Sequence, residues 1–243
     1  MILTCFDNKN TGPIVLFIHG TASSNEVWQN QYNLLKNTEY RLVGIDLRGH
    51  GSSANKDSSG NLEDHLTDLK ETLDYLKIDK PATIIGHSFG AVLAIKFAER
   101  YPNSVKKLLL VSLPTKISPI LHKYYKWLLG KPLELVKENC NFLEKLPLQK
   151  TAKLAIKADI SVVRKIWSES KKWDFLNQTP KVLCPIHLSV GRFDYIALKS
   201  RVVGLHKKLP NSTCKVFNWA SHNCIEQARD EFNKWISILL TEK

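Results

Sequence analysis

Short apolar runs alternate with helical patterns in both terminal parts of the 243-residue chain, and this alternation predicts successive β-α-β units. The apolar runs are nearly continuous, as in strands that are buried on both faces of a parallel sheet. We expect strands at residues 13–18, 41–46, 82–86, 107–112, 185–191 and 213–218, and one short strand within residues 2–6. The pattern therefore predicts an α/β fold with a mostly parallel sheet.

A stripe of leucines marks the most regular of the predicted helices. Apolar residues recur there at steps of three and four residues, which places them on one buried face. The stripe consists of Leu62, Leu66, Leu69, Leu73 and Leu76. Further helices are expected at residues 25–37, 89–101, 197–208 and 224–240, so that helices flank the sheet.

The middle of the chain breaks this alternation. Residues 116–179 contain no strand pattern and suggest three or four amphipathic helices, separated by Gly130-Lys131-Pro132 and Pro147. We therefore expect a core formed by residues 1–115 and 180–243, with residues 116–179 inserted as a helical lid. No linker indicates a second independent domain, and the chain length suits a single one.

The segment Gly86-His87-Ser88-Phe89-Gly90 follows a predicted strand and precedes a helical run. This is the strand-turn-helix context in which a G-x-S-x-G motif carries a nucleophile. The turn is so tight that side chains two residues before and after the serine would collide, which explains Gly86 and Gly90. A purely structural turn is the alternative interpretation, but the context favours catalysis by Ser88.

A serine hydroxyl is a weak nucleophile and needs a base that an acid keeps in the right tautomer. Asp194 follows the strand expected at residues 185–191, and His222 lies in the loop before the last helix. Taken singly, each could be an ordinary surface residue. Their order and their positions after strands match a hydrolase topology, so we predict Ser88, Asp194 and His222 as catalytic residues.

Acyl transfer also needs two backbone N–H donors for the oxyanion that develops in the transition state. Phe89 follows the nucleophile directly, and its amide is one expected donor. The other is the amide of Thr21, because Gly20 lets this loop pass close to the pocket. The sequence therefore predicts an oxyanion hole formed by Thr21 and Phe89.

Several motifs together resemble the α/β-hydrolase fold superfamily over nearly the whole chain. They are His19-Gly20-Thr21 with Trp28 downstream, the DLRGHGS segment at residues 46–52, the serine motif at 86–90, the GRFD segment at 191–194, and Ser221-His222. The second motif is specific for a branch of cofactor-free esterases, lactonases, C–C hydrolases and haloperoxidase-like proteins. In that branch a lid follows the sixth strand, the position that residues 116–179 occupy. The resemblance implies a serine carboxylesterase without a cofactor.

The resemblance also implies specific departures and exclusions. The N-terminal part leaves room for only one strand before the first of the six, so one or two edge strands of the family's eight-stranded sheet should be missing. Dehalogenases and epoxide hydrolases carry a carboxylate where this chain has Ser88, which excludes them. His19 and His87 occupy positions that are mostly structural in the family, and we expect no metal site. Asp46 and Arg48 are expected to pair and brace their loop.

Positive charge is concentrated in the middle of the chain. The whole chain has 35 Lys and Arg against 23 Asp and Glu, a formal net charge of +12, and residues 116–181 hold 14 of the basic and six of the acidic residues. Scattered lysines usually form a solvated helix face, whereas a concentrated patch can dock an acidic protein. No nucleic-acid recognition motif is present, and no apolar run approaches the roughly 20 residues of a membrane span. We expect neither nucleic acid nor membrane as a partner, and a monomer.

Cysteine usage and the N-terminal residues bear on the compartment. Five cysteines, odd in number and without a CxxC pair, fit neither a disulfide framework nor a zinc site. The N-terminus lacks the basic and apolar segments of a signal peptide. We therefore expect five free thiols and a cytoplasmic protein.

In size, lid position and motifs the chain resembles the esterases that demethylate the pimeloyl thioester on acyl carrier protein in biotin synthesis. Those enzymes receive the acidic carrier on a basic lid. The resemblance implies that methyl ester as substrate and acyl carrier protein as partner, although general short-chain carboxylesterases share the motifs. Aromatic side chains are the candidate substrate contacts, and at helical spacing such residues more often form the core of a lid. They are Trp28, Tyr124, Trp127, Phe142 and Trp167.

Two other functions remain open. The same three catalytic residues could hydrolyse a C–C bond or an enol lactone in a small carboxylate, which a Lys or Arg of the lid would bind. Alternatively, the fold could bind a ligand without catalysis, since a fold does not fix a function. Activity on such a carboxylate with no turnover of simple esters would favour the first. Ligand binding without labelling by a serine-directed phosphonate would favour the second.

Overall fold

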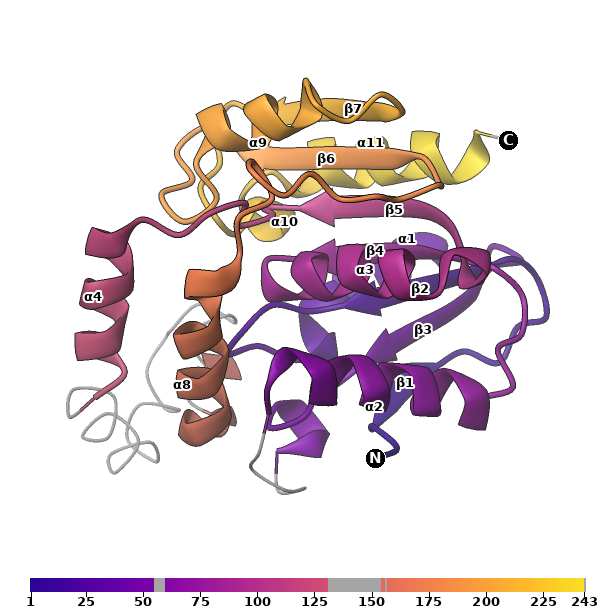
Figure 1. Cartoon of the computed structure of the whole chain (residues 1–243). Helices are drawn as coiled ribbons and strands as arrows, with labels where there is room; N and C mark the ends of the chain where they lie inside the picture. The colour runs from indigo at the N-terminus through magenta and orange to yellow at the C-terminus, as the bar shows by residue number, and fades with distance from the viewer. Residues whose placement is uncertain (55–59, 131–153, 156, 243) are drawn as a thin grey trace.

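The computed structural model describes residues 1–54, 60–130, 154, 155 and 157–242. Its centre is a seven-stranded sheet in the order β1-β3-β2-β4-β5-β6-β7 (Figure 1). β1 pairs antiparallel with β3, and the other pairs in the sheet are parallel. The strands are β1 (Cys5–Asp7), β2 (Ile14–Ile18), β3 (Arg41–Ile45), β4 (Ala82–His87), β5 (Val105–Val111), β6 (Ile186–Gly191) and β7 (Ser212–Phe217).

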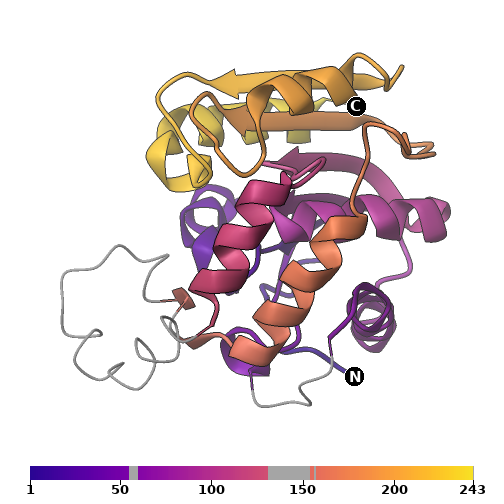
Figure 2. The same ribbon diagram turned by 60° about the vertical axis from the view of Figure 1, so that its left-hand side comes forward.

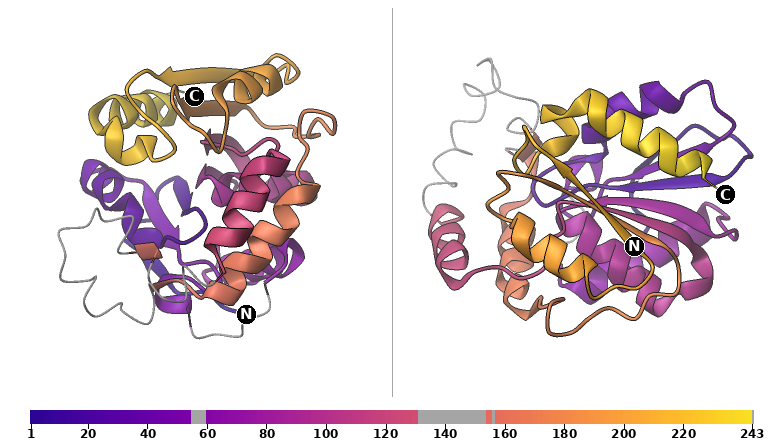
Figure 3. Two further views of the ribbon diagram at one scale, coloured as in Figure 1. Left: turned by 90° about the vertical axis from the view of Figure 1, so that its left-hand side faces the viewer. Right: turned by 90° about the horizontal axis from the view of Figure 1, so that it is seen from above.

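Helices cover both faces of the sheet, as the two right-angle views in Figure 3 show. The α-helices of the described residues are α1 (Gln29–Leu35), α2 (Leu62–Tyr75), α3 (Phe89–Arg100), α4 (Pro119–Leu128), α8 (Ile160–Glu169), α9 (Lys199–His206), α10 (Cys224–Gln227) and α11 (Arg229–Thr241). Short 3-10 turns occupy Asn25–Trp28, Gly51–Ser53, Pro102–Ser104 and Ser170–Lys172. α2 begins at a capping box, in which Asn61 and Asp64 each accept a hydrogen bond from the other's backbone N–H.

Alternation along the buried strands divides the core into two layers. In β2, Leu16 and Ile18 belong to the layer that contains α2, α3 and α9. Val15 and Phe17 point to the opposite layer, which contains α1 and α11. Both layers are apolar, which accounts for the continuous hydrophobic runs in the sequence. The predicted α/β architecture, a mostly parallel sheet flanked by helices, is confirmed.

The segment between β5 and β6 leaves the sheet. Its described helices, α4 and α8, pack against each other beyond the carboxyl ends of the parallel strands (Figures 1 and 2). No strand occurs among the described residues of this segment, as predicted. Pro147, expected to separate two helices, lies outside the described residues.

Two predicted helices are each divided in the structure. The helix expected at residues 25–37 is a 3-10 turn followed by α1, and the one expected at 224–240 is split at Ala228 into α10 and α11. Ala228 has φ −117° and ψ 40°, outside the helical range. The side chain of Gln227 accepts hydrogen bonds from the backbone and hydroxyl of Ser221, so the short helix α10 is fixed to the loop that carries His222.

Two sequence-based expectations concern the thiols and membrane spans. Cys5, Cys184, Cys214 and Cys224 are free, and Cys140 lies outside the described residues. Within the ranges given above, no helix has both the length and the apolar content to cross a bilayer.

Candidate active site

Ser88 lies in the sharp turn between β4 and α3. Its backbone has φ 53° and ψ −115°, a conformation that L residues rarely adopt and that the surrounding packing must maintain. A Cβ atom on Gly86 would lie 2.4 Å from the carbonyl oxygen of Gly90, and one on Gly90 would lie 2.3 Å from that of Ile18. Any side chain at position 86 or 90 would therefore clash with the backbone, so both positions require glycine, as the motif predicts.

His222 reaches Ser88 from the loop after β7. Its Nε2 lies 2.9 Å from the Ser88 Oγ. The backbone carbonyl of His222 accepts hydrogen bonds from His87 Nε2 at 2.9 Å and from Ser112 Oγ at 3.1 Å. Burial and the nearby His222 ring lower the pKa of His87 to about 4, so His87 is neutral near pH 7. The His222 loop is thus anchored to the ends of β4 and β5.

Asp194 completes the set from the loop after β6. Its two carboxylate oxygens lie 2.9 and 3.1 Å from His222 Nδ1, and Oδ1 also accepts from the backbone amides of Ile196 and Ala197. Burial alone would raise the pKa of Asp194, but the hydrogen bond and charge interaction with His222 and the amide of Ala197 hold it below its usual value. A carboxylate at this position fixes the proton on Nδ1 and leaves Nε2 free to accept from Ser88.

The two predicted oxyanion residues border the same space. Thr21 and Phe89 both line the cavity above Ser88. A Cβ on Gly20 would lie 3.0 Å from the Ser88 Cβ, so the loop that carries Thr21 passes directly beside the serine. Phe89 is the first residue of α3, where a helix leaves its amide without an intrahelical acceptor. The arrangement can offer two N–H groups to an oxygen bound at Ser88.

The cavity above Ser88 has a volume of about 330 Å³. Its described walls are apolar except for Thr21, Tyr125 and the Ser88–His222 pair. Side chains from the segment between β5 and β6 form most of the wall. They include Ile117, Tyr125, Leu128, Leu129, Ala158, Ile160, Val163, Ile166, Trp167 and Trp173. The space suits an alkyl or acyl chain next to the serine hydroxyl.

The predicted aromatic contacts are only partly brought to this cavity. Trp167 lines it, stacked on Tyr125 with ring centroids 4.1 Å apart. Tyr124 and Trp127 do not line it, because they lie on the outer side of α4 with half or more of their surface exposed. Trp28 is wrong as a substrate contact, since it is fully buried against Phe17 in the opposite layer of the core. Phe142 lies outside the described residues.

Tyr125 and Trp173 belong to the aromatic side chains of the inserted segment that could line an acyl pocket, but they are not among the candidate contacts named above, and both face the cavity. Trp173 stacks on Phe89 with ring centroids 5.7 Å apart and so packs against the residue that follows Ser88. The sequence pattern does not single out Tyr125 from its exposed neighbour Tyr124, which points about 100° away around α4.

A second groove, with basic side chains in its lining, also borders Trp167. It has a volume of about 360 Å³ and shares Leu129 and Trp167 with the cavity above Ser88. Its other lining residues are His122, Lys126, Arg164, Ser168 and Lys171. Part of the positive charge predicted for this segment is therefore gathered between α4 and α8.

The residues expected to brace the DLRGHGS segment have partners other than the predicted ones. Asp46 accepts hydrogen bonds from the amides of Asn25 and Ser52, at 2.7 and 2.9 Å. Arg48 instead forms a two-pronged ion pair with Asp68 of α2. The expected pair of Asp46 and Arg48 is thus replaced by two contacts to different elements, because the sharp turn directs the two side chains apart. Among the described residues, no group of three or more His, Cys, Asp or Glu could hold a metal ion.

Comparison with known proteins places this geometry in a family. The family model described as "alpha/beta hydrolase fold" matches residues 13–151. The chain belongs to the α/β-hydrolase fold family. Human epoxide hydrolase 4 is 31% identical over 137 residues, which cover 56% of this chain and 36% of that protein. The match thus spans about a third of that relative.

Two other proteins match this α/β hydrolase over most of its length. The putative carbamate hydrolase RutD of Escherichia coli is 24% identical over 238 residues, which cover 91% of this chain and 88% of that one. The structure of a thermophilic esterase from Thermogutta terrifontis superposes with a TM-score of 0.82 and 21% identity, covering 98% of this chain and 92% of the esterase. These likenesses support the fold.

Proposed function

We propose that the protein is a serine hydrolase that cleaves a carboxylic ester through an acyl-enzyme intermediate. The observation that carries the proposal is the hydrogen-bonded series Ser88, His222 and Asp194 at the base of an apolar cavity. Ser88 is the nucleophile, His222 the general base and acid, and Asp194 the group that orients His222. The amides of Thr21 and Phe89 bind the oxyanion.

The distance between Ser88 and His222 allows direct proton transfer in each step of ester hydrolysis. Ser88 Oγ attacks the ester carbonyl while its proton passes to His222 Nε2, 2.9 Å away. The tetrahedral intermediate collapses, and the leaving alkoxide takes that proton from His222. Water then attacks the acyl group, gives its proton to His222 and releases the carboxylic acid, while Ser88 regains the proton.

The identity of residue 88 argues against epoxide opening, although epoxide hydrolases are among the relatives. A carboxylate that opens an epoxide forms an ester, which water can hydrolyse. Ser88 would instead form an ether, which has no carbonyl carbon for water to attack, and the enzyme would be trapped. Ser88 therefore supports acyl transfer as the chemistry.

The walls of the cavity support an acyl chain over a small carboxylate. Burial of each CH₂ group in such an apolar space stabilises the bound state by about 0.8 kcal/mol. A C–C or enol-lactone hydrolase that acts on a carboxylate would need a cation near the bound ligand. The wall contributed by the described residues contains no Lys or Arg, so that alternative function lacks support there.

Within this class, we propose the methyl ester of a pimeloyl chain on acyl carrier protein as substrate. The basic groove supports the proposal, because Lys126 and Lys171 are exposed beside Trp167, which also lines the acyl cavity. An acidic carrier attracted to these lysines would present its acyl chain close to the cavity. In this interpretation, α4 and α8 are part of a lid that both covers the acyl chain and receives its carrier.

The test compares the wild type with Ser88→Ala on two substrates, at low and at high salt. One substrate is a short-chain chromogenic ester, and the other is the methyl-ester acyl chain on acyl carrier protein. We expect Ser88-dependent hydrolysis of both, with faster turnover of the carrier substrate that weakens as salt rises. Equal or better turnover of the free ester would leave a general carboxylesterase.

A separate experiment, labelling by a phosphonate, tests whether the protein is a serine hydrolase at all. A serine-directed phosphonate should label Ser88 in the wild type and leave Ser88→Ala unlabelled. If folded wild type neither hydrolyses esters nor takes the label, the chain is a non-catalytic member of the family.

A further inference from the structure

The loop that carries Thr21 contains a backbone conformation that needs an explanation. Ala22, the next residue, has φ 56°, in the left-handed region that residues with a Cβ avoid. Such a conformation persists only where neighbouring groups hold it. The backbone N–H of Ala22 donates a hydrogen bond to Nε2 of His50, at 3.0 Å.

The surroundings of His50 make its Nε2 atom a hydrogen-bond acceptor. It is fully buried, and its Nδ1 lies 2.8 Å from the carbonyl oxygen of Arg48. A carbonyl can only accept, so Nδ1 carries the proton and Nε2 has the free lone pair. Burial, together with the nearby His19, lowers the pKa of His50 to about 3, so the ring stays neutral in this tautomer.

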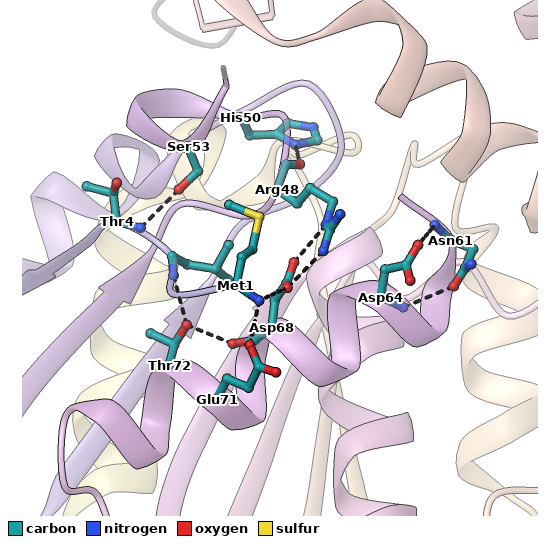
Figure 4. A network of polar contacts seen from close by, with 11 residues as sticks. Met1, Thr4, Arg48, His50, Ser53, Asn61, Asp64, Asp68, Glu71 and Thr72 are labelled. Carbon is teal, nitrogen blue, oxygen red and sulfur yellow. Dashed lines mark hydrogen bonds and ion pairs between the residues drawn. The ribbon is translucent and has the colours of Figure 1, made fainter. Parts of the chain in front are cut away.

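The support for His50 extends to helix α2, as Figure 4 shows. Arg48 Nε and Nη2 donate to the two carboxylate oxygens of Asp68, at 2.8 and 2.9 Å. Asp68 is buried on α2, and Arg48 is only 8% exposed. A two-pronged pair of this kind fixes the Arg48 side chain and so restrains the carbonyl that orients His50.

The same turn holds the loop at two further points. His19 Nε2 accepts from the amide of Leu47 at 3.0 Å, and Asp46 accepts from the amide of Asn25 at 2.7 Å. These contacts lie on either side of Thr21 and Ala22. Of the three points of attachment, only the contact from His50 acts on the residue directly after Thr21.

We propose that His50 is a positioning residue for oxyanion binding. By holding Ala22 in its left-handed conformation, His50 fixes the path of the loop directly after Thr21, and so restrains the Thr21 backbone whose own N–H, in the Gly20–Thr21 peptide, is to bind the oxyanion. The inference rests on the proposed function, in which that amide stabilises the tetrahedral intermediate. His50 touches neither the substrate nor Ser88 and acts through the loop.

The test uses two amide variants that differ in reach. In His50→Gln, the Oε1 atom can occupy the place of Nε2 and accept from Ala22, whereas the Oδ1 atom of His50→Asn is too short to do so. We expect His50→Asn and His50→Ala to lose about 10- to 100-fold in kcat with KM changed less than threefold, a part of the loss typical of a deleted oxyanion donor. His50→Gln should stay within about fivefold of the wild type.

A second measurement isolates transition-state binding. A trifluoromethyl ketone adds to the serine and mimics the tetrahedral intermediate, whereas the matching methyl ketone mimics the bound ester. His50→Asn should weaken the first inhibitor by the factor lost in kcat and leave the second within threefold. Leu69→Ala, a core truncation on the same helix as Asp68, controls for lost stability and should keep the wild-type ratio of the two affinities.

A third measurement tests the backbone strain at Ala22. Glycine adopts positive φ without penalty, so Ala22→Gly should raise kcat by a larger factor in the His50→Asn background than in the wild type. Equal kcat and equal inhibitor ratios in His50→Gln, His50→Asn and the wild type would overturn the positioning role. If the wild type showed neither ester turnover nor phosphonate labelling, the proposed function itself would be contradicted. The experiment therefore distinguishes failure of the positioning role from failure of the proposed function.

Discussion

The cavity above Ser88 is bounded by two regions of opposite character. On the sheet side, polar groups are buried or partly buried and hydrogen-bonded to partners from distant segments, as in the contacts of His222 with Ser88, Asp194 and His87. On the side of α4 and α8, the wall is apolar, and α4 has no buried residue of its own. Under the proposed function, the sheet edge sets the chemistry, and the inserted helices set which substrate meets it.

The two regions also differ in backbone conformation. Ala22, Ser88 and Ser112 all have positive φ; Ser88 and Ser112 directly follow β4 and β5, and Ala22 lies in the loop after β2. Each such conformation costs on the order of 1–3 kcal/mol and persists only where its surroundings over-determine it. α4 and α8 are regular helices with ordinary serine and aspartate N-caps. Changes at the sheet edge should therefore slow every substrate, whereas changes on α4 and α8 should alter the choice between substrates.

Among the substitutions that test this division of roles, Asp194→Asn is expected to have the largest effect. Oδ1 of Asp194 already accepts from two backbone amides, so the asparagine would turn its NH₂ group toward His222. His222 Nδ1 would then accept, Nε2 would carry the proton, and the ring could not take the proton of Ser88. We expect kcat to fall by about 10⁴ for every ester, because a wrong tautomer removes the base.

Steady-state rates on a short and a long ester measure that loss, and phosphonate labelling measures the reactivity of Ser88 separately. The loss should be the same factor for both esters. A substrate-dependent loss would mean that the polar set also contributes to selectivity, against the division proposed here.

The same contrast explains what the sequence could predict. Ser88, Asp194 and His222 each follow a strand, and the strands of a parallel sheet end at one edge, so chain order alone brings them together. Side-chain partners within the loops depend on the angle of a turn, and so the sequence does not predict the pairing of Arg48 with Asp68. On α4, adjacent residues differ by about 100° in direction, and the sequence pattern does not say which face meets the cavity.

A cavity-filling change on α8 tests the role of the inserted helices. Val163 is buried and lines the cavity, and Val163→Trp should shorten the space for the acyl chain. We expect kcat/KM for an octanoyl ester to fall by about 10- to 100-fold relative to an acetyl ester, since each excluded CH₂ forfeits about 0.8 kcal/mol. Lys165→Trp, which places the same side chain at an exposed position of α8, is the control and should leave the ratio unchanged.

Stability near the sheet edge should depend on pH through His65. This residue of α2 is fully buried, and neither ring nitrogen has a hydrogen-bond partner among the described residues. Burial, followed by the nearby His50, lowers the pKa of His65 to about 3. The folded-state pKa lies below the ordinary value of about 6.5, so protons bind preferentially to the unfolded chain. The stability that depends on neutral His65 is present above pH 6.5 and is lost as pH falls toward 3.

His65→Leu should remove this dependence. We expect the variant to gain about 2 kcal/mol more over the wild type at pH 5 than at pH 8, measured by urea unfolding at both values. His206→Leu, at a partly exposed histidine on α9, is the matched control for replacing a histidine by leucine. An equal gain for His65→Leu at both pH values would mean that His65 reaches solvent and titrates normally.

The smallest effect is expected from reversing the charge of the basic groove, in Lys126→Glu with Lys171→Glu. Both lysines are exposed beside Trp167 but outside the cavity, so hydrolysis of a free short-chain ester should not change. For the acyl chain on acyl carrier protein, kcat/KM should fall about three- to tenfold at low salt, and the difference should vanish at high salt because screening removes the attraction. Lys207→Glu with Lys234→Glu changes the net charge equally at two exposed positions, one directly after α9 and one on α11. An equal loss in that control pair would assign the effect to net charge, and the inserted helices would then select the acyl chain without docking its carrier.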